Sequence, residues 1–276
     1  MDGRSRRTRD RARGRRCRDV TRGLASVAIV MVVYAACASA QRSESPRSGL
    51  TFASPEIRAM QADDVANPGM LWVERGSRLW QAEPDGAAKS CAGCHGDATT
   101  AMRGVAARYP AWDAGTAAVL DLEARINSCR ERRQERPALP RESDELLALT
   151  AFVAHQSRGM PVAVHIDGPA SAAFERGRAL YRTRVGQMNL ACTQCHDDNA
   201  GKRLLAETIS QGQPNGYPAY RLEWQSLGSL QRRIRACFFG VRAEMPAPGA
   251  PELTDLELYL AWRAQPLPVE TPAVRR

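Results

Sequence analysis

Apolar residues recur at three- and four-residue spacing in several stretches of this 276-residue chain, which is the pattern of helices that bury one face. The stretches are 72–80, 117–130, 142–155, 170–182, 227–237 and 252–263. Ser143-Asp144, Pro169 and Thr254-Asp255 stand where helix starts are expected. No stretch alternates well enough to predict a strand. The pattern therefore predicts a mainly α protein.

The helical pattern occurs twice. ERGSRLW at 74–80 corresponds to ERGRALY at 175–181, and LEARINSC at 122–129 corresponds to LQRRIRAC at 230–237. The second copy has seven extra residues before LQRRIRAC. A repeat of about 100 residues, with its own helices in each copy, indicates two tandem domains rather than a solenoid. We predict domains at 67–160 and 161–276, joined near the Gly- and Pro-containing segment 159–171 and preceded by an N-terminal extension at 41–66.

The first forty residues differ from this body. An arginine-dense run leads into the apolar stretch LASVAIVMVVYAAC and ends in Ala38-Ser39-Ala40, which together indicate a secretory signal peptide at 1–40. The apolar stretch is shorter than the roughly 20 residues of a membrane span, although lipoprotein cleavage at Cys37 and an uncleaved anchor are alternatives. We therefore expect a periplasmic protein with no membrane span after cleavage.

Cleavage also changes the interpretation of charge. The leader carries ten Arg and three Asp, so it supplies most of the formal net charge of +9. The mature chain is then nearly neutral, and the basic composition gives no reason to expect a nucleic-acid partner.

Six of the eight cysteines remain after cleavage, and four of them form two copies of one motif. CAGCH at 91–95 and CTQCH at 192–196 match the C-x-x-C-H pattern of covalent c-type haem attachment. Cys91 and Cys94, and Cys192 and Cys195, would bind the two vinyl groups of a porphyrin, leaving His95 and His196 to ligate iron. A redox or zinc C-x-x-C motif does not explain the histidine in both copies. We predict two covalent c-type haems and two tandem cytochrome c-like domains.

The other two cysteines, Cys129 and Cys237, fall at equivalent places in the repeat. They are candidates for the sixth iron ligand, since a c-type iron needs a second axial ligand or an open site. Methionine is the usual alternative, but the methionines do not correspond between repeats: Met102, Met160, Met188 and Met245. A Cys129–Cys237 disulfide is a second alternative, and His155 and His165 are interpreted as a helix and a linker residue.

The surroundings of the two cysteines differ. Cys129 lies in the charged stretch INSCRERRQ, whereas Cys237 is followed by two phenylalanines and has Arg233, Arg235 and Arg242 close in sequence. Arg233 is four residues before Cys237, so it shares that helix face. Cationic neighbours lower a thiol pKa and attract anions. The second site therefore suits a small anion that meets a sulfur atom.

Four features together resemble one family: both C-x-x-C-H motifs, R-I-N-x-C at 125–129, R-x-x-x-C-x-x-x-x-R-A-E at 233–244, and the ending LELYLAWRAQPLPVETPAVR at 256–275. The chain resembles the SoxA family, the larger cytochrome subunit of SoxAX, in its two-haem form. The resemblance implies a periplasmic L-cysteine S-thiosulfotransferase that pairs with a small cytochrome, SoxX. Such an enzyme joins thiosulfate oxidatively to a cysteine of the carrier SoxYZ and passes the electrons to an accepting cytochrome.

The resemblance also implies roles for individual residues. His95 and Cys129 would ligate one iron, and His196 and Cys237 the other. Cys237, which can be a persulfide in the family, would be catalytic, and Arg233 and Arg242 would bind substrate. A dihaem electron carrier, or a thiosulfate dehydrogenase that makes tetrathionate, remains the alternative function.

Overall fold

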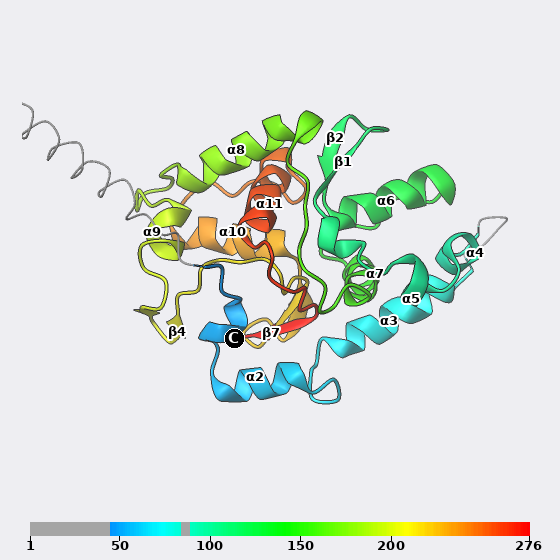
Figure 1. Cartoon of the computed structure of the whole chain (residues 1–276), viewed down its shortest axis with the longest axis horizontal. Coiled ribbons are helices and arrows are strands. Elements are labelled where there is room, and N and C mark those ends of the chain that lie inside the picture. The colour runs from blue at the N-terminus through cyan, green and yellow to red at the C-terminus, as the bar shows by residue number, and fades with distance from the viewer. Residues whose placement is uncertain (1–44, 84–88) are drawn as a thin grey trace, which may run out of the picture. The chain divides into compact units, whose positions relative to one another are not determined.

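The computed structural model describes residues 45–83 and 89–276, so the predicted signal peptide at 1–40 lies outside the described residues. Helices predominate in this part of the chain (Figure 1). They are α2 (Pro55–Ala62), α3 (Met70–Gln81), α4 (Cys91–His95), α5 (Ala98–Ala101), α6 (Leu122–Arg133), α7 (Asp144–His155), α8 (Ser171–Arg182), α9 (Cys192–His196), α10 (Leu230–Gly240) and α11 (Pro251–Arg263). Three short 3-10 turns are η1 (Gly49–Phe52), η2 (Ala106–Arg108) and η3 (Gly168–Ala170).

Six of these helices match the predicted stretches, but two predicted starts are wrong. The stretch 117–130 begins with a strand, and α6 starts only after Asp121, whose side chain accepts a hydrogen bond from the Ala124 N–H at 2.7 Å. Helix α11 starts at Pro251, so Thr254 and Asp255 lie inside it rather than before it. Asp255 instead pairs with Arg176, which explains a buried carboxylate within a helix.

The structure contains short strands that the sequence did not predict. They form a β1–β2 hairpin, a β3–β4 hairpin and a three-stranded sheet in the order β6-β5-β7, in which β5 is antiparallel to β6 and parallel to β7. The strands are β1 (Ala111–Asp113), β2 (Ala118–Leu120), β3 (Arg203–Leu204), β4 (Glu207–Thr208), β5 (Ala219–Arg221), β6 (Ser226–Gly228) and β7 (Ala273–Arg275). Segments of two or three residues are too short to show an alternating pattern.

The repeated sequence forms two equivalent helix pairs. Helix α3 packs against α7 in the first half, and α8 packs against α11 in the second. A Cβ added at Gly76 would lie 2.1 Å from the Ala148 carbonyl oxygen, and one added at Gly177 would lie 1.9 Å from the Asp255 carbonyl oxygen. Glycine in both copies of E-R-G therefore permits close approach of the helix backbones.

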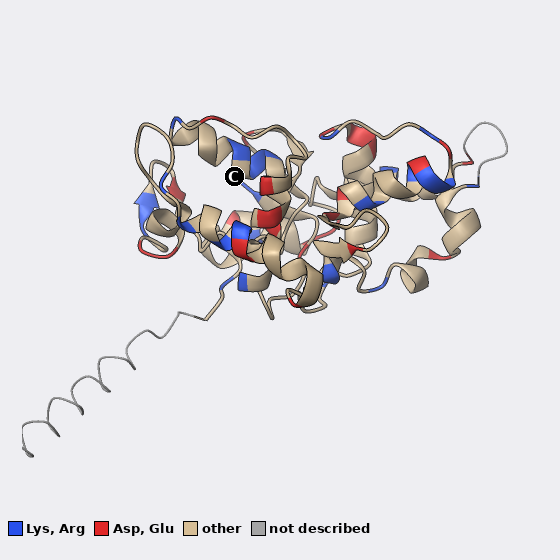
Figure 2. Ribbon diagram, turned by 90° about the horizontal axis from the view of Figure 1, so that it is seen from above, with Lys and Arg blue, Asp and Glu red and all other residues tan. Residues whose placement is uncertain are grey.

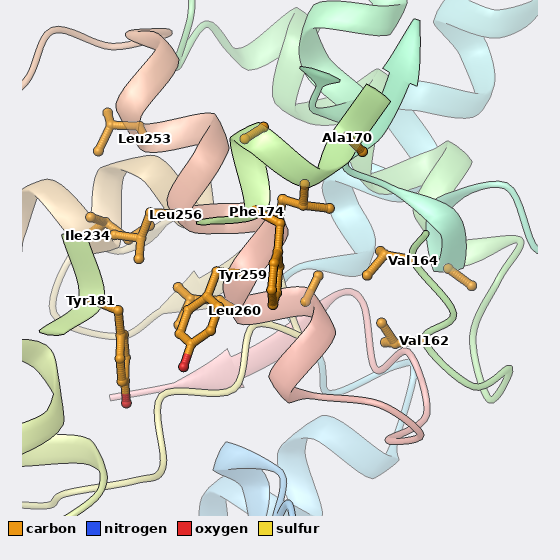
Figure 3. Close-up of a cluster of buried hydrophobic side chains, with 14 of the residues drawn as sticks. Val162, Val164, Ala170, Phe174, Tyr181, Ile234, Leu253, Leu256, Tyr259 and Leu260 are labelled. Atoms are coloured by element: carbon orange, nitrogen blue, oxygen red, sulfur yellow. The ribbon is translucent and has the colours of Figure 1, made fainter. Parts of the chain in front are cut away.

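The largest buried cluster lies in the second half, between α8, α10 and α11 (Figure 3). Tyr181 packs on Tyr259 with ring centroids 5.2 Å apart, and Phe174 packs on Tyr259 at 5.6 Å. Ile234 and Phe238 of α10 belong to the same cluster. This packing fixes the helix that carries Cys237.

The predicted N-terminal extension is part of the fold. Helix α2 packs beside β7, where Gln61 accepts a hydrogen bond from the Val274 N–H at 3.0 Å and another from Arg275. Residues 46–276 form one compact unit. The boundaries at 67–160 and 161–276 stay a prediction, although α3–α7 and α8–α11 occupy different sides of this unit (Figure 1).

Basic and acidic positions are interspersed along the described ribbon (Figure 2). Within residues 45–83 and 89–276, none of the helices is both long and apolar enough to span a bilayer.

Candidate haem sites and candidate reactive thiol

The first C-x-x-C-H motif forms the one-turn helix α4. Ser90 precedes it and accepts a hydrogen bond from the Gly93 N–H at 2.9 Å, which satisfies a donor at the helix start. Trp80 of α3 lies beside the motif, with its ring 5.7 Å from the His95 ring, and it donates a hydrogen bond to the Gly96 carbonyl at 3.1 Å. The spacing of the motif thus places Cys91, Cys94 and His95 around one turn.

These side chains open onto a cavity of about 620 Å³ that Cys129 of α6 also lines. The volume lies within the range of roughly 300–1,000 Å³ that is usual for ligand pockets. Much of the wall is apolar or aromatic: Trp80, Val105, Tyr109, Trp112, Leu122, Ile126, Leu149 and Val153. Two thiols, one imidazole and an apolar enclosure are what a covalently attached haem requires, so the residues fit this group.

Cys129 lies close to the attachment motif, as the repeat predicted. Burial raises the pKa of the Cys91 thiol, and a negative charge on Cys129 would raise it further. Although the stretch around Cys129 contains no aromatic residue, the fold brings Tyr109 and Trp112 to the same cavity. Both reach it from the segment before α6.

Other residues also line this cavity. Met102, one of the alternative methionines, and His165, in the segment between the halves, lie within the same enclosure as Cys129. Four arginines also line the cavity: Arg108, Arg125, Arg130 and Arg133. Buried Nε of Arg130 has no hydrogen-bond partner among the described residues, and guanidinium groups of this kind suit the carboxylates of haem propionates. The order of residues along the chain gave no signal that these side chains converge.

The second motif forms α9, also one turn long. Gln194 of the motif accepts a hydrogen bond from the Ala191 N–H at 2.8 Å. Nδ1 of His196 lies 2.7 Å from the Ser210 carbonyl oxygen, a position in which Nδ1 donates and Nε2 keeps its lone pair. Such a hydrogen bond orients an imidazole for metal binding through Nε2.

An aromatic residue secures each motif from the preceding helix. Tyr181 corresponds to Trp80 in the repeat, and its hydroxyl donates to Asp197 at 2.8 Å, while Arg263 of α11 pairs with the same carboxylate. The bond of Trp80 to Gly96 and that of Tyr181 to Asp197 both reach the residue that follows the motif histidine. The two halves therefore hold their motifs in the same way.

Cys237 of α10 lies beside the second motif. Burial raises the pKa of Cys192 to about 11, and the charge of a Cys237 thiolate adds to the effect, which also raises the pKa of Cys195. For Cys237 itself, burial raises the pKa, but a hydrogen bond with His196 and the charges of Arg233 and Arg221 outweigh burial and leave the pKa below its ordinary value. The second half thus gathers four predicted site residues: Cys192, Cys195, His196 and Cys237.

The arginines around Cys237 differ in position. Burial lowers the pKa of Arg233, but a Cys237 thiolate and nearby acidic groups raise it above its ordinary value, which fits a cation held beside the thiol. Arg242 is exposed, just beyond α10, so the described contacts give it no part beside Cys237. Arg221 of β5 is only 4% exposed and was missed, because a strand brings it to the site from outside the local motif.

The remaining predicted features of this stretch divide between core and surface. Phe238 is buried, whereas Phe239 is 73% exposed and Met245 is 44% exposed. All six cysteines of the described residues are unpaired, and Cys129 and Cys237 lie at different motifs rather than in one disulfide.

Comparison with known proteins gives three findings. Residues 75–162 match the family model described as SoxA/TsdA, cytochrome c domain. The chain is 43% identical over 249 residues to the L-cysteine S-thiosulfotransferase subunit SoxA of Pseudaminobacter salicylatoxidans, covering 90% of this chain and 87% of that protein. The chain belongs to the SoxA family. A second member, from Rhodovulum sulfidophilum, is 40% identical over 86% of this chain and 82% of its own length.

A solved structure agrees in fold. The crystal structure of SoxXA from P. pantotrophus superposes with a TM-score of 0.81 at 37% identity, covering 84% of this chain and 87% of that chain. These findings confirm the resemblance to the SoxA family and the mainly α cytochrome c fold. The cytochrome c domain also makes this a chain that carries covalently bound c-type haem.

Proposed function

We propose that this SoxA-family chain holds two haems and catalyses the oxidative transfer of thiosulfate to a carrier cysteine. Cys91 and Cys94 would attach the first haem, and His95 and Cys129 would bind its iron. Cys192 and Cys195 would attach the second haem, and His196 and Cys237 would bind its iron. The shared cavity supports the first set, and the proximity of the thiols and His196 supports the second. When bound, the haems supply an acceptor for single electrons.

The observation that carries the proposal is the position of Cys237, which lies beside His196 and faces the positive charges of Arg233 and Arg221. Thiosulfate is a dianion, so a guanidinium group can bind its sulfonate oxygens through charge-assisted hydrogen bonds. The lowered pKa of Cys237 favours the thiolate, which is the form that attacks sulfur. Arg233 would therefore bring the anion and the thiolate together; Arg242 would act from the exposed end of α10.

The chemistry balances when two electrons leave the sulfur atoms. The Cys237 thiolate and the terminal sulfur of thiosulfate would form a disulfide bond and release two electrons, for which the haems, when bound, would supply the path to an accepting cytochrome. A carrier thiolate then attacks the terminal sulfur of the bound thiosulfate, which breaks the new bond and restores the Cys237 thiolate. The product is a carrier S-thiosulfonate, and the net reaction consumes one carrier thiolate and one thiosulfate.

The partners follow from the family. The name SoxXA of the solved relative describes an assembly of two kinds of subunit, and we propose a small SoxX-like cytochrome as the partner here and a SoxYZ-like protein as the carrier. Export by the leader at 1–40 would place this chain in the periplasm, where it would meet these partners. The proposed domains at 67–160 and 161–276 would each enclose one haem.

Intact mass spectrometry of the secreted protein tests the haem proposal. The expected mass is that of a chain beginning at or near Gln41 with two haems, and a mass with one haem or none contradicts it. Carrier assays test the transfer proposal: incubation with thiosulfate, the partner subunit and the carrier should add a thiosulfonate to one carrier cysteine. Reduction of the haems by thiosulfate with tetrathionate as product and no carrier adduct would favour a thiosulfate dehydrogenase instead.

A further inference from the structure

A second, smaller cavity lies where the two halves meet. Its volume is about 120 Å³, and its walls include Asp121 and Glu123 from the start of α6, Arg141 before α7, and Glu257 of α11. The three carboxylic acids are only 6%, 5% and 7% exposed. One arginine therefore faces three buried acids, and none of the four has a part in the proposed sulfur chemistry.

The hydrogen bonds divide unequally among the acids. Asp121 accepts from the Ala124 N–H at 2.7 Å, from both terminal nitrogens of Arg141 at 2.7 and 3.1 Å, and from Gln231 at 3.0 Å. Glu123 accepts one bond from Arg141 at 3.1 Å. Glu257 has the Gln231 side chain as a hydrogen-bonding neighbour. Asp121 thus accepts most of the hydrogen bonds that can stabilise a buried carboxylate here, and the two glutamates accept fewer.

The electrostatics agree with this division. Burial, with a smaller contribution from the Asp121 charge, raises the pKa of Glu123 to about 8, against the opposing effect of Arg141. Burial also raises the pKa of Glu257 well above its usual value, as do the charges of Asp121 and Glu123. Burial and the neighbouring negative charges therefore favour the protonated form of both glutamates.

The cavity is polar enough to hold water. Thr150, Ser229 and Thr271 line it together with Asn215, which is 5% exposed and whose Oδ1 has no hydrogen-bond partner among the described residues. A water molecule needs roughly 10–15 Å³ of such space and two or more polar partners, so several can fit. The charge of Glu142, whose side chain is 25% exposed, also raises the pKa of Glu123, so an ionisable group that reaches solvent lies near the pair.

This cavity lies next to the first haem cavity. Tyr109 and Leu122 line both cavities, so one layer of side chains separates the glutamates from the enclosure that Cys91, His95 and Cys129 line. Charges interact strongly over such distances inside a protein, where the effective dielectric constant is far below that of water. A change of one charge at the iron would therefore alter the proton affinity of the glutamates.

We propose that Glu123 and Glu257 form a proton-exchange site that is coupled to the redox state of the first haem. When the haem gains one electron, one carboxylate of the pair takes up one proton from solvent; when the haem is oxidised, the proton is released. Other ionisable or charged groups that face the pair are Asp121 on α6, Arg141 and Glu142 before α7, Arg232 of α10 beside Glu142, and the cavity residues Tyr109 and Tyr217. The proposal rests on a haem in the first cavity and not on thiosulfate transfer.

Potentiometric titration of the intact haem-loaded protein between pH 6 and 9 tests the proposal. If one proton accompanied each electron, the potential would fall by about 59 mV per pH unit, a tenfold change in the reduction equilibrium constant. We expect at least a threefold change per pH unit for the haem whose spectroscopic signal depends on Cys129. Glu123→Gln together with Glu257→Gln should reduce this pH dependence by half or more. Glu252→Gln, an exposed position on α11, is the matched control and should retain it.

Infrared difference spectroscopy of the wild type detects protonation of the carboxylic acids directly, so it tests the proposal even if the double variant does not fold. Reduction should increase the carbonyl band of a protonated carboxylic acid, and the band should shift in heavy water. A pH-independent potential in the wild type, no carboxylic acid band on reduction, or an unchanged pH dependence in the double variant would overturn the proposal. A protein that shows the coupling but forms no carrier adduct would refute the thiosulfate transfer alone.

Discussion

The two halves hold equivalent cysteines on equivalent helices, but the arginine one turn before each cysteine has a different partner. Asp121 precedes α6 and Ser229 precedes α10, and the side-chain oxygen of each accepts a hydrogen bond from a backbone N–H of the first turn. Arg125 then pairs with Asp113 at 2.9 Å and is 50% exposed, whereas Arg233 faces Cys237 from a half-buried position. Equivalent helices thus position the cysteine in both halves. The residues on neighbouring strands differ, so the arginine pairs with an acid in the first half and faces the thiol in the second.

The difference lies in the local acids and strands. In the first half, the β1–β2 hairpin supplies Asp113, which neutralises Arg125. In the second half, β5 supplies Arg221, which pairs with Glu223 at 2.8 Å and with Glu207 at 3.5 Å. Against the effect of burial, the charges of Arg233 and Arg221 still lower the pKa of Cys237. We therefore expect equal loss of a haem ligand in the two halves, but loss of sulfur chemistry only in the second.

The largest expected effect is loss of a ligand. Cys129→Ala and Cys237→Ala should each remove one low-spin histidine/thiolate signal from the electron paramagnetic resonance spectrum, because each proposed site would lose its thiolate. Both haems should stay attached through the C-x-x-C-H cysteines in either variant. A spectrum that retains both signals in either variant would contradict the assignment of that cysteine, and Met102 or His165 would be the next candidate in the first cavity.

Replacing the arginine one turn before each cysteine should affect turnover only in the second half. Arg233→Ala should lower kcat/KM for carrier loading by at least tenfold, since a hydrogen bond to a charged group contributes roughly 1.5–3 kcal/mol. The haem spectra should change little. Arg125→Ala removes the equivalent residue of the first half and is the control, with an expected effect under threefold. Equal losses in the two variants would show that Arg233 has no special role with substrate.

Replacing the glycine at each helix contact with alanine should lower the free energy of unfolding by a similar amount in the two halves. Gly76→Ala and Gly177→Ala place a methyl group against a backbone carbonyl of the partner helix, so each should lower the free energy of unfolding by roughly 1–3 kcal/mol. Gly240→Ala is the control, because its added methyl would have no neighbour within 4 Å. Denaturant midpoints measure the three effects. A neutral result at Gly177 would mean that α8 and α11 separate at little cost.

The last expected effect concerns pH and stability. The pKa of Glu123 is about 8 in the folded protein against 4.5 as its usual value, so the folded state binds more protons between these values. Stability therefore falls as pH rises from about 4.5 through about 8. Glu123→Gln removes this loss, so its melting temperature should improve relative to the wild type between pH 5 and pH 9. A constant difference across this range would mean that Glu123 is already ionised in the fold.

Sequence alone predicted those features that local spacing determines. The two motifs, the repeated glycines and the equivalence of Cys129 with Cys237 are all patterns within short segments. The convergence of Arg221, His165 and the acids around Arg141 depends on contacts between distant segments, which no local pattern records. The short strands were not predicted for a related reason, since two or three residues become a strand only when a partner strand pairs with them.

Cys237 is the thiol that we propose reacts with thiosulfate, and the function of the second half depends on it. Mass spectrometry of the carrier after incubation with thiosulfate, partner subunit and each haem-loaded variant measures this directly. We predict that Cys129→Ala leaves a clear thiosulfonate adduct on the carrier cysteine, and that Cys237→Ala leaves none. A Cys237→Ala protein that loads the carrier at the wild-type rate would contradict this role and leave Cys237 as an iron ligand alone.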